Sequence, residues 1–234
     1  MATYNEIRKD IIATCKRMNA AGLNVGSAGN ISVRIDGGLL LTPSGIPYDE
    51  MRPEQIVEMD EAGRYYGDFV PSSEWRFHHD ILKHRPDVNV VLHSHATHCS
   101  ILACCRLDIP AIHYMVAVAG GKVVKCSDYA PFGTEALSVA ALAALGPRMA
   151  CLLGNHGVIT LGNTLSSAFD VLQEVENLAR IYIGVRTLGA GVLLNEAEMD
   201  VVLERFKTYG KQLEDMDPTL TERVEPPPHG GRSR

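Results

Sequence analysis

Apolar residues recur over the first twenty positions at the spacing of a helix with one buried face. Between about residues 3 and 20, Ile7, Ile11, Cys15 and Met18 follow one another at intervals of three or four, which puts them on one side of a helix. The same kind of pattern predicts a second helix that begins near the paired serines Ser72 and Ser73, with one of them as N-cap, and that ends before Pro86. Further helices are predicted over residues 97–106, 133–145, 165–188 and 196–210.

Short β-branched runs between these helices predict strands. They lie at residues 31–35, 38–42 and 111–118, and MACLLGNHGVITLG predicts two short strands joined by a turn. The run VNVVLHSH is continuously apolar, as in a strand that is covered on both faces. Because helices and strands alternate, the chain is predicted to be a single α/β domain, although periodicity leaves the direction of the strands open.

The composition narrows the class of protein. The 234 residues carry a formal net charge of −6, which argues against a nucleic-acid-binding protein. The chain has no apolar run of about 18 residues, and its N-terminus lacks the apolar middle of a signal peptide, so we expect no membrane span and a cytoplasmic location. The six cysteines form no C-x-x-C pair and are predicted to be reduced core residues.

Histidines provide the first chemical signal. His93 and His95 are two apart on a predicted strand, so both imidazoles leave the same face and can grip a metal ion. His156 lies in the turn GNHG, and Glu74 follows the serines in the first turn of the second helix. Three histidines with one exchangeable carboxylate are typical of a catalytic zinc site, although an isolated H-x-H is as often a structural pair, and cobalt or manganese could replace zinc.

A second reading starts from the string H-S-H-A-T-H. With His98, it is similar to the H-x-H-x-D-H motif of metallo-β-lactamase-type hydrolases, but Thr97 stands where that motif has its aspartate. The further metal ligands of that fold are also missing downstream. The other histidines of the central region are predicted to be structural or to lie on the surface: His78, His79, His84 and His113.

Three segments of small residues could bind a phosphate. They are GSAGN (26–30), TPSG (42–45) and the paired serines 72 and 73 at the start of a predicted helix, where free backbone N–H groups and the helix dipole favour an anion. None of them contains a basic residue, so hydrogen bonds would replace an arginine clamp. Each alone is more often an ordinary turn or cap, but their number beside a candidate metal site favours a phosphorylated substrate.

Several longer strings occur together in the order of a known family. GSAGNISVR, LLLTPSGIPYDE, PSSEWRFH, HSHATHC, IPAIHYM, AGG, FGT, GNHG and ERFKTYG lie between about residues 5 and 212. On these motifs the chain resembles the class II aldolase/adducin family, most strongly its members that cleave L-fuculose 1-phosphate. The resemblance implies an α/β domain, here over residues 1–215, with a central, mainly antiparallel sheet flanked by helices, and the Pro- and Gly-rich segment 216–234 is predicted to be a disordered tail.

The resemblance also implies site residues and an assembly. It implies a C4 homotetramer with active sites between subunits. Zn²⁺ would be bound by His93, His95, His156 and Glu74, with Glu74 also serving as the catalytic base. Tyr114 and Tyr209 match tyrosines that reach in from neighbouring subunits. The implied phosphate pocket consists of Gly29, Asn30, Ser44, Gly45, Ser72 and Ser73.

The implied reaction is the reversible cleavage of a ketose 1-phosphate, such as L-fuculose 1-phosphate, into dihydroxyacetone phosphate and a small aldehyde. An aldolase for 5-deoxyribulose or 5-methylthioribulose 1-phosphate would keep the same motifs, so it stays open. A pentulose 5-phosphate 4-epimerase shares the zinc histidines, but Tyr114 and Glu74 in their motifs favour the aldolase. An adducin-like head domain with no enzymatic role would be expected to have lost the metal ligands.

Overall fold

A single sheet of eight strands forms the centre of the molecule in a computed structural model that describes residues 4–208. The strands lie in the order β4-β3-β2-β1-β5-β8-β7-β6. Every neighbouring pair is antiparallel except β6 with β7, so the predicted mainly antiparallel sheet is confirmed. Their bounds are β1 (Asn30–Ile35), β2 (Gly38–Leu41), β3 (Val57–Asp60), β4 (Tyr65–Tyr66), β5 (Val90–Ser94), β6 (Lys125–Cys126), β7 (Ala150–Leu153) and β8 (Gly157–Gly162).

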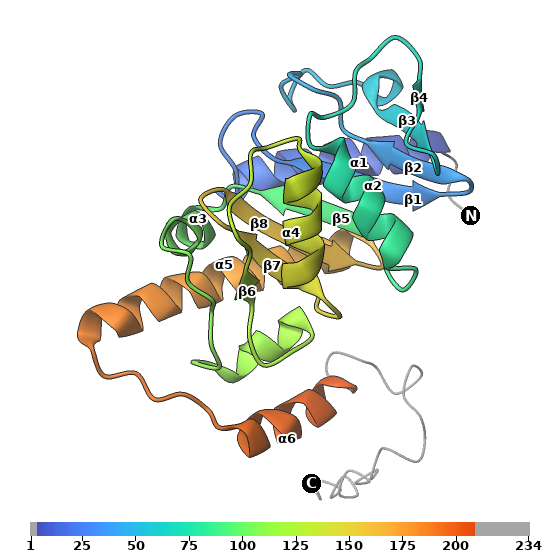
Figure 1. Ribbon diagram of the computed structural model, residues 1–234. Coiled ribbons are helices and arrows are strands. Elements are labelled where there is room, and N and C mark those ends of the chain that lie inside the picture. Colours follow the sequence, from blue (N-terminus) through green and yellow to red (C-terminus); the bar gives the residue numbers. More distant parts are fainter. Residues whose placement is uncertain (1–3, 209–234) are drawn as a thin grey trace, which may run out of the picture.

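Helices cover both faces of the sheet (Figure 1). One face carries α2 (Trp75–His84) and α4 (Glu135–Leu145), and the other carries α1 (Tyr4–Ala20), α3 (Thr97–Cys104) and α5 (Leu165–Leu188). The remaining elements are the short 3-10 helices η1 (Pro53–Gln55) and η2 (Tyr114–Ala119) and the helix α6 (Glu196–Phe206), which packs on η2 away from the sheet. Each face of the sheet thus has its own hydrophobic core.

The alternation of side chains along β1 divides its residues between the two cores. Ile31 and Val33 belong to the core under α1 and α5, so Asn30 and Ser32 point to the opposite face, where α2 lies. Asn30 pairs with His93 of β5 in the antiparallel register. The register therefore puts the polar start of β1 beside the first predicted metal ligand.

One predicted strand is wrong. Residues 111–118 contain a bend and then η2, which begins at Tyr114. The Nδ1 atom of His113 accepts a hydrogen bond from the backbone N–H of Met115, and Gly120 ends η2 with a φ of 74°. A short apolar run has no periodicity that separates a strand from a buried turn of helix, and here the cap at His113 decides for the helix.

The start of α2 also differs from the prediction. The helix begins at Trp75, so Glu74 lies just before it and no serine is its N-cap. Ser72 instead accepts a hydrogen bond at Oγ from the backbone N–H of Glu74. Among the cysteines, all of which are free, Cys104 and Cys105 are exposed, so the prediction of core residues is wrong for these two. Tyr209 and the tail predicted for 216–234 lie outside the described residues.

Candidate active site

The three predicted metal histidines converge at one end of the sheet. His93 is in β5, His95 follows that strand, and His156 lies in the turn between β7 and β8. Because β8 pairs with β5, this turn lies beside the end of β5. One possible ligand atom from each of the three histidines falls within 4.8 Å of the others, and the rings stand edge to face, 4.7–5.0 Å apart between centroids.

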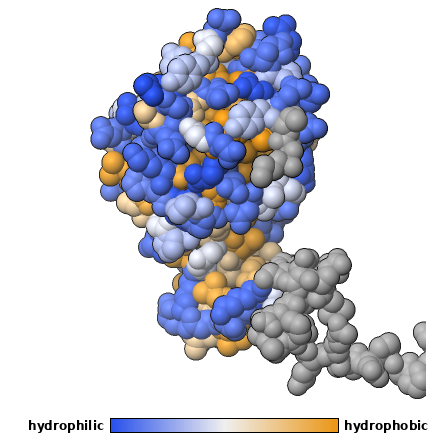
Figure 2. Space-filling model, turned by 90° about the vertical axis from the view of Figure 1, so that its right-hand side faces the viewer, coloured by the Kyte–Doolittle hydropathy of each residue, from blue (hydrophilic) through white to orange (hydrophobic). Residues whose placement is uncertain are grey.

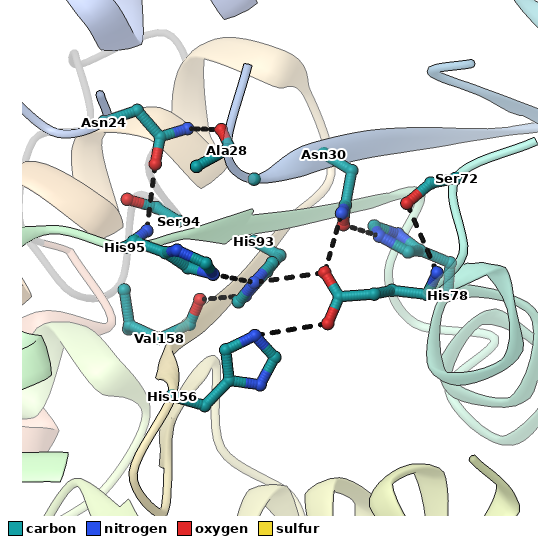
Figure 3. Close-up of polar contacts among 12 residues, drawn as sticks. Asn24, Ala28, Asn30, Ser72, His78, His93, Ser94, His95, His156 and Val158 are labelled. Carbon is teal, nitrogen blue, oxygen red and sulfur yellow. Dashed lines mark hydrogen bonds and ion pairs between the residues drawn. The ribbon is translucent and has the colours of Figure 1, made fainter. Parts of the chain in front are cut away.

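Hydrogen bonding fixes how His93 faces the candidate metal centre, the point at which His93, His95 and His156 converge. Its Nδ1 atom lies 3.0 Å from the carbonyl oxygen of Val158, and a carbonyl can only accept, so Nδ1 carries the proton. The lone pair of Nε2 therefore points at His95 and Glu74 (Figure 3). Burial, reinforced by His156 and His95, holds the pKa of His93 well below its usual value. His93 is thus neutral at physiological pH, as a metal ligand must be.

Glu74 closes the centre from the side of α2. Its Oε2 atom lies 3.3 Å from Nε2 of His93 and accepts a hydrogen bond of 2.9 Å from Nδ2 of Asn30. Its Oε1 atom lies 3.2 Å from Nε2 of His156 and has no hydrogen-bond partner among the described residues, although it is buried. A buried carboxylate oxygen without a hydrogen bond is costly, so it calls for a compensating charge.

These contacts fit a divalent cation. The lone pair on Nε2 of His93 faces a carboxylate oxygen at 3.3 Å and Nε2 of His95 at 3.1 Å, which is unfavourable unless positive charge lies between them. Imidazole nitrogens with one carboxylate are the donor set of catalytic zinc. We conclude that this chain's donors suit a bound metal ion at this place.

A cavity of about 400 Å³ opens beside the centre. Its wall combines the candidate ligands Glu74, His95 and His156 with residues from every segment predicted to bind phosphate. No lysine or arginine belongs to the described lining, so a phosphate here would be held by hydroxyl and N–H groups. The six predicted phosphate residues all lie on this wall: Gly29, Asn30, Ser44, Gly45, Ser72 and Ser73.

Two glycines let the backbone approach the histidines closely. A Cβ atom on Gly29, whose φ is +80°, would lie 2.6 Å from the carbonyl oxygen of His93. A Cβ atom on Gly157 would lie 2.4 Å from the carbonyl oxygen of Ser94, and it would also touch the rings of His93 and His95. Both distances are shorter than real contacts allow. The glycines of GSAGN and GNHG thus serve the packing of the centre.

The structure also shows site residues that the sequence analysis missed. Tyr129, Phe132 and Asn155 line the cavity, although FGT and GNHG drew attention to their surroundings. Asn24 accepts a hydrogen bond at Oδ1 from the backbone N–H of His95. Phe132 belongs to FGT and Asn155 to GNHG, so membership of these motifs was the available signal for them. Tyr129 lies only near FGT, and an aromatic residue in a loop has no spacing rule that marks a cavity wall.

One residue predicted for the site, Tyr114, is not brought to the cavity by its own chain. Tyr114 begins η2, is 46% exposed and does not line the cavity, whereas Tyr209 lies outside the described residues. His98 also stays apart from the centre, because its Nδ1 atom lies 2.7 Å from a carboxylate oxygen of Glu176. The hydrolase reading required His98 as a ligand, and the geometry gives it another partner.

Comparison with known proteins agrees with this geometry. The family model of the class II aldolase and adducin N-terminal domain matches residues 9–183. The chain belongs to the class II aldolase and adducin family. The chain is 49% identical to the 5-methylthioribulose-1-phosphate/5-deoxyribulose-1-phosphate aldolase of Rhodospirillum rubrum, over 87% of this chain and 92% of that protein.

Other relatives carry a different substrate in their names. The L-fuculose phosphate aldolase of Escherichia coli is 45% identical over 90% of this chain and 99% of its own. A solved structure of an L-fuculose 1-phosphate aldolase superimposes with a TM-score of 0.85 at 38% identity, covering 88% of this chain and 98% of the other. This aldolase is therefore a lyase of a metal-dependent family. Within residues 4–208, none of its helices has the length and apolar character needed to cross a membrane.

Proposed function

We propose that this aldolase reversibly cleaves a ketose 1-phosphate into dihydroxyacetone phosphate and a small aldehyde, with Zn²⁺ as its metal. The observation that carries the proposal is the meeting of His93, His95, His156 and Glu74 at a cavity whose wall contains all six predicted phosphate residues. When bound by the three histidines, zinc supplies a Lewis acid for the negative charge that develops on the ketone side of the substrate.

The chain's own residues divide the remaining work. Ser44, Ser72 and Ser73 hold the phosphate by hydrogen bonds. In the direction of condensation, the carboxylate of Glu74 takes a proton from C3 of dihydroxyacetone phosphate, and the resulting enediolate forms the C3–C4 bond with the aldehyde. The phenol of Tyr114 of a neighbouring subunit donates its proton to the aldehyde oxygen, which becomes the C4 hydroxyl. Cleavage reverses these steps, and proton exchange with solvent restores both groups. Tyr209 is proposed to approach the same site from a neighbour.

Because Tyr114 comes from a neighbouring subunit, the proposed mechanism needs an assembled oligomer, and we propose a homotetramer. We also propose that the enzyme works in the cytoplasm. Support comes from Tyr114, whose exposed side chain lies outside the cavity of its own chain. Figure 2 shows apolar side chains exposed on the lower lobe of the molecule, where α6 lies. Val201 of α6 and Leu193, which lies shortly before this helix, are exposed apolar residues. An exposed apolar surface of this kind is typical of an interface between subunits.

We propose L-fuculose 1-phosphate as the first substrate to test. The 49% identity to the Rhodospirillum rubrum relative favours 5-methylthioribulose or 5-deoxyribulose 1-phosphate as the second candidate. These substrates share the half that becomes dihydroxyacetone phosphate and differ in the aldehyde. The aromatic side chains Tyr129 and Phe132 on the cavity wall suit an aldehyde with an apolar end.

A substrate panel tests the proposal. Purified protein with a measured metal content is incubated with L-fuculose, 5-deoxyribulose, 5-methylthioribulose and L-rhamnulose 1-phosphates, and dihydroxyacetone phosphate is detected by a coupled assay. We expect release from at least one of them and its loss after chelation, with recovery on adding zinc. Ribulose 5-phosphate belongs in the same panel, because its conversion in the absence of any cleavage would overturn the proposal in favour of an epimerase.

A further inference from the structure

A chain of hydrogen-bonded, buried polar side chains leads from Glu74 through Asn30 into the space between β1 and α2. Ser32 Oγ lies 2.8 Å from Nδ1 of His78, and Nε2 of His78 lies 2.5 Å from Oδ1 of Asn30. The Nδ2 atom of Asn30 then donates to Oε2 of Glu74 at 2.9 Å. Figure 3 shows the Asn30 amide beside the ring of His78. All four side chains are less than 10% exposed.

The fold builds this chain from three separate places. Asn30 and Ser32 are two apart on β1 and so share the face that looks toward α2. His78 lies on α2 next to Phe77, with the two rings stacked 4.6 Å apart, and Glu74 lies just before the same helix. The buried face of α2 thus carries one polar ring among apolar residues, directly over the polar stretch of β1.

When Glu74 is ionised, only one assignment of donors and acceptors satisfies all the hydrogen bonds from Ser32 to Glu74. A carboxylate accepts only, so the amide nitrogen of Asn30 must face it and the amide oxygen must face His78. Nε2 of His78 must then carry the hydrogen, which leaves Nδ1 to accept from the hydroxyl of Ser32. Burial lowers the pKa of His78 to about 3, so the ring is neutral and has a single N–H to give.

We propose that His78 is a positioning residue for catalysis, which fixes the amide of Asn30 so that its N–H group holds Oε2 of Glu74 toward the metal histidines. The inference rests on the proposed function, in which Glu74 handles the proton at C3. In the opposite tautomer, the amide of Asn30 would turn its oxygen to the carboxylate, and two acceptors would face each other in a buried place. The carboxylate of Glu74 would then turn away from the metal histidines or take up a proton.

This assignment also changes the role of Asn30. The resemblance to the family implied a phosphate contact, and Asn30 does line the cavity. One of its two amide hydrogens, however, is directed to Glu74. Asn30 therefore links the phosphate side of the cavity to the proton-transfer group, and His78 sets the orientation of that link.

A role in packing and a role in positioning predict different variants. His78→Leu fills much of the space but removes the N–H group, whereas His78→Gln can present an amide nitrogen near the place of Nε2. We expect His78→Leu to lower kcat by about 10- to 100-fold, the range for partners of metal-site ligands, with little change in KM. His78→Gln should recover most of that loss. The exposed His84 on the same helix provides the control His84→Leu, which should keep the wild-type kcat.

A second measurement keeps the inference testable without any substrate. In zinc-loaded protein with ¹⁵N-labelled histidine, the ring of His78, assigned by its loss in His78→Gln, should show a protonated Nε2 and a bare Nδ1. Ser32→Ala removes the donor to Nδ1 and should weaken this preference while the protein stays folded. A protonated Nδ1 in the wild type would overturn the proposal, as would a His78→Leu variant with the wild-type kcat.

These outcomes separate the inference from the proposed function. If no ketose 1-phosphate is cleaved, the proposed function fails. The tautomer of His78 still shows whether the amide of Asn30 directs its N–H group to Glu74. If cleavage is found and His78→Gln is as slow as His78→Leu, the proposed function stands and the positioning role fails. If His78→Leu does not fold, Ser32→Ala and the tautomer measurement decide.

Discussion

Glu74 lies beside three histidines, and burial lowers the pKa of each of their imidazole rings. The pKa values of His93, His95 and His156 are all lowered, in each case chiefly by burial. These rings therefore offer lone pairs instead of protons at neutral pH. In the proposed mechanism, the carboxylate of Glu74 is therefore the group that exchanges a proton, and the three histidines hold the metal ion throughout.

Glu74→Gln tests this division of labour. The amide keeps the shape of the side chain but can no longer take up or release a proton at C3, so kcat should fall by at least about 100-fold. Zinc content should remain near one ion per subunit, because three imidazoles are still present. Metal analysis and steady-state kinetics on the same preparation give the answer. A variant with the wild-type kcat would remove Glu74 from the proton transfer.

Among the structural elements, β5 with the residue after it gave a predictable pair, His93 and His95, whereas their third partner was less predictable. Two residues on one strand share a face by geometry alone, so the grouping of His93 with His95 followed from spacing. His156 depends on the pairing of β8 with β5, a long-range contact that no local pattern encodes. Only the GNHG motif pointed to it. The failed strand at 111–118 has the same origin, because packing and the cap at His113, not propensity, decide that segment.

The turn between β7 and β8 yields a prediction for Gly157. Gly157→Ala would put a methyl group 2.4 Å from the carbonyl oxygen of Ser94 and against two imidazole rings, so the turn must move. We expect a loss of about 1–3 kcal/mol in the free energy of unfolding and a weaker affinity for zinc. Urea unfolding and competition with a chelator measure these two quantities.

Gly184→Ala is the matched control for that variant. Gly184 lies within α5, and a Cβ atom there would meet nothing within 4 Å. Alanine favours a helix by about 1 kcal/mol over glycine, so this control should be at least as stable as the wild type, with unchanged zinc affinity. Equal behaviour of the two variants would show that the close approach at Gly157 does not matter.

In the assembled protein, the tyrosine proposed to exchange the C4 hydroxyl proton must come from outside the cavity of its own chain. Tyr114 lies on η2, beside α6 and away from the cavity lining. The sequence could indicate this tyrosine through its motif, but a single chain cannot show which cavity it serves. The assembly is therefore the part of the proposed site that one sequence determines least.

Mixed assemblies test whether neighbours complete the site. Tyr114→Phe alone should slow cleavage by about 100-fold or more with unchanged zinc content. If it is unfolded and refolded together with Glu74→Gln, random mixing should give roughly a quarter of the sites both native groups. Activity should then return to about that fraction of the wild type. No gain over the two separate variants would mean that both residues act within one subunit.

The buried histidines also set the pH dependence of stability in the metal-free protein. Folded His78 stays neutral down to a pKa of about 3, whereas the unfolded ring takes up a proton below about pH 6.5. The unfolded state therefore binds more protons at low pH, and stability falls as the pH decreases. Between pH 6.5 and 5 this one ring should cost about 2 kcal/mol. Urea unfolding with a chelator present should show a smaller fall in His78→Gln, while His84→Gln should match the wild type.

The register between β1 and β5 has a consequence for making the protein. A shift of one residue would exchange the two faces of β1, which would bury Asn30 and Ser32 in the apolar core of Ile31 and Val33 and leave the centre without its amide. A misfolded fraction of this kind would have no partial activity. The activity per milligram of a preparation saturated with zinc should therefore measure its correctly folded fraction, and it can serve as a quality criterion during expression and refolding.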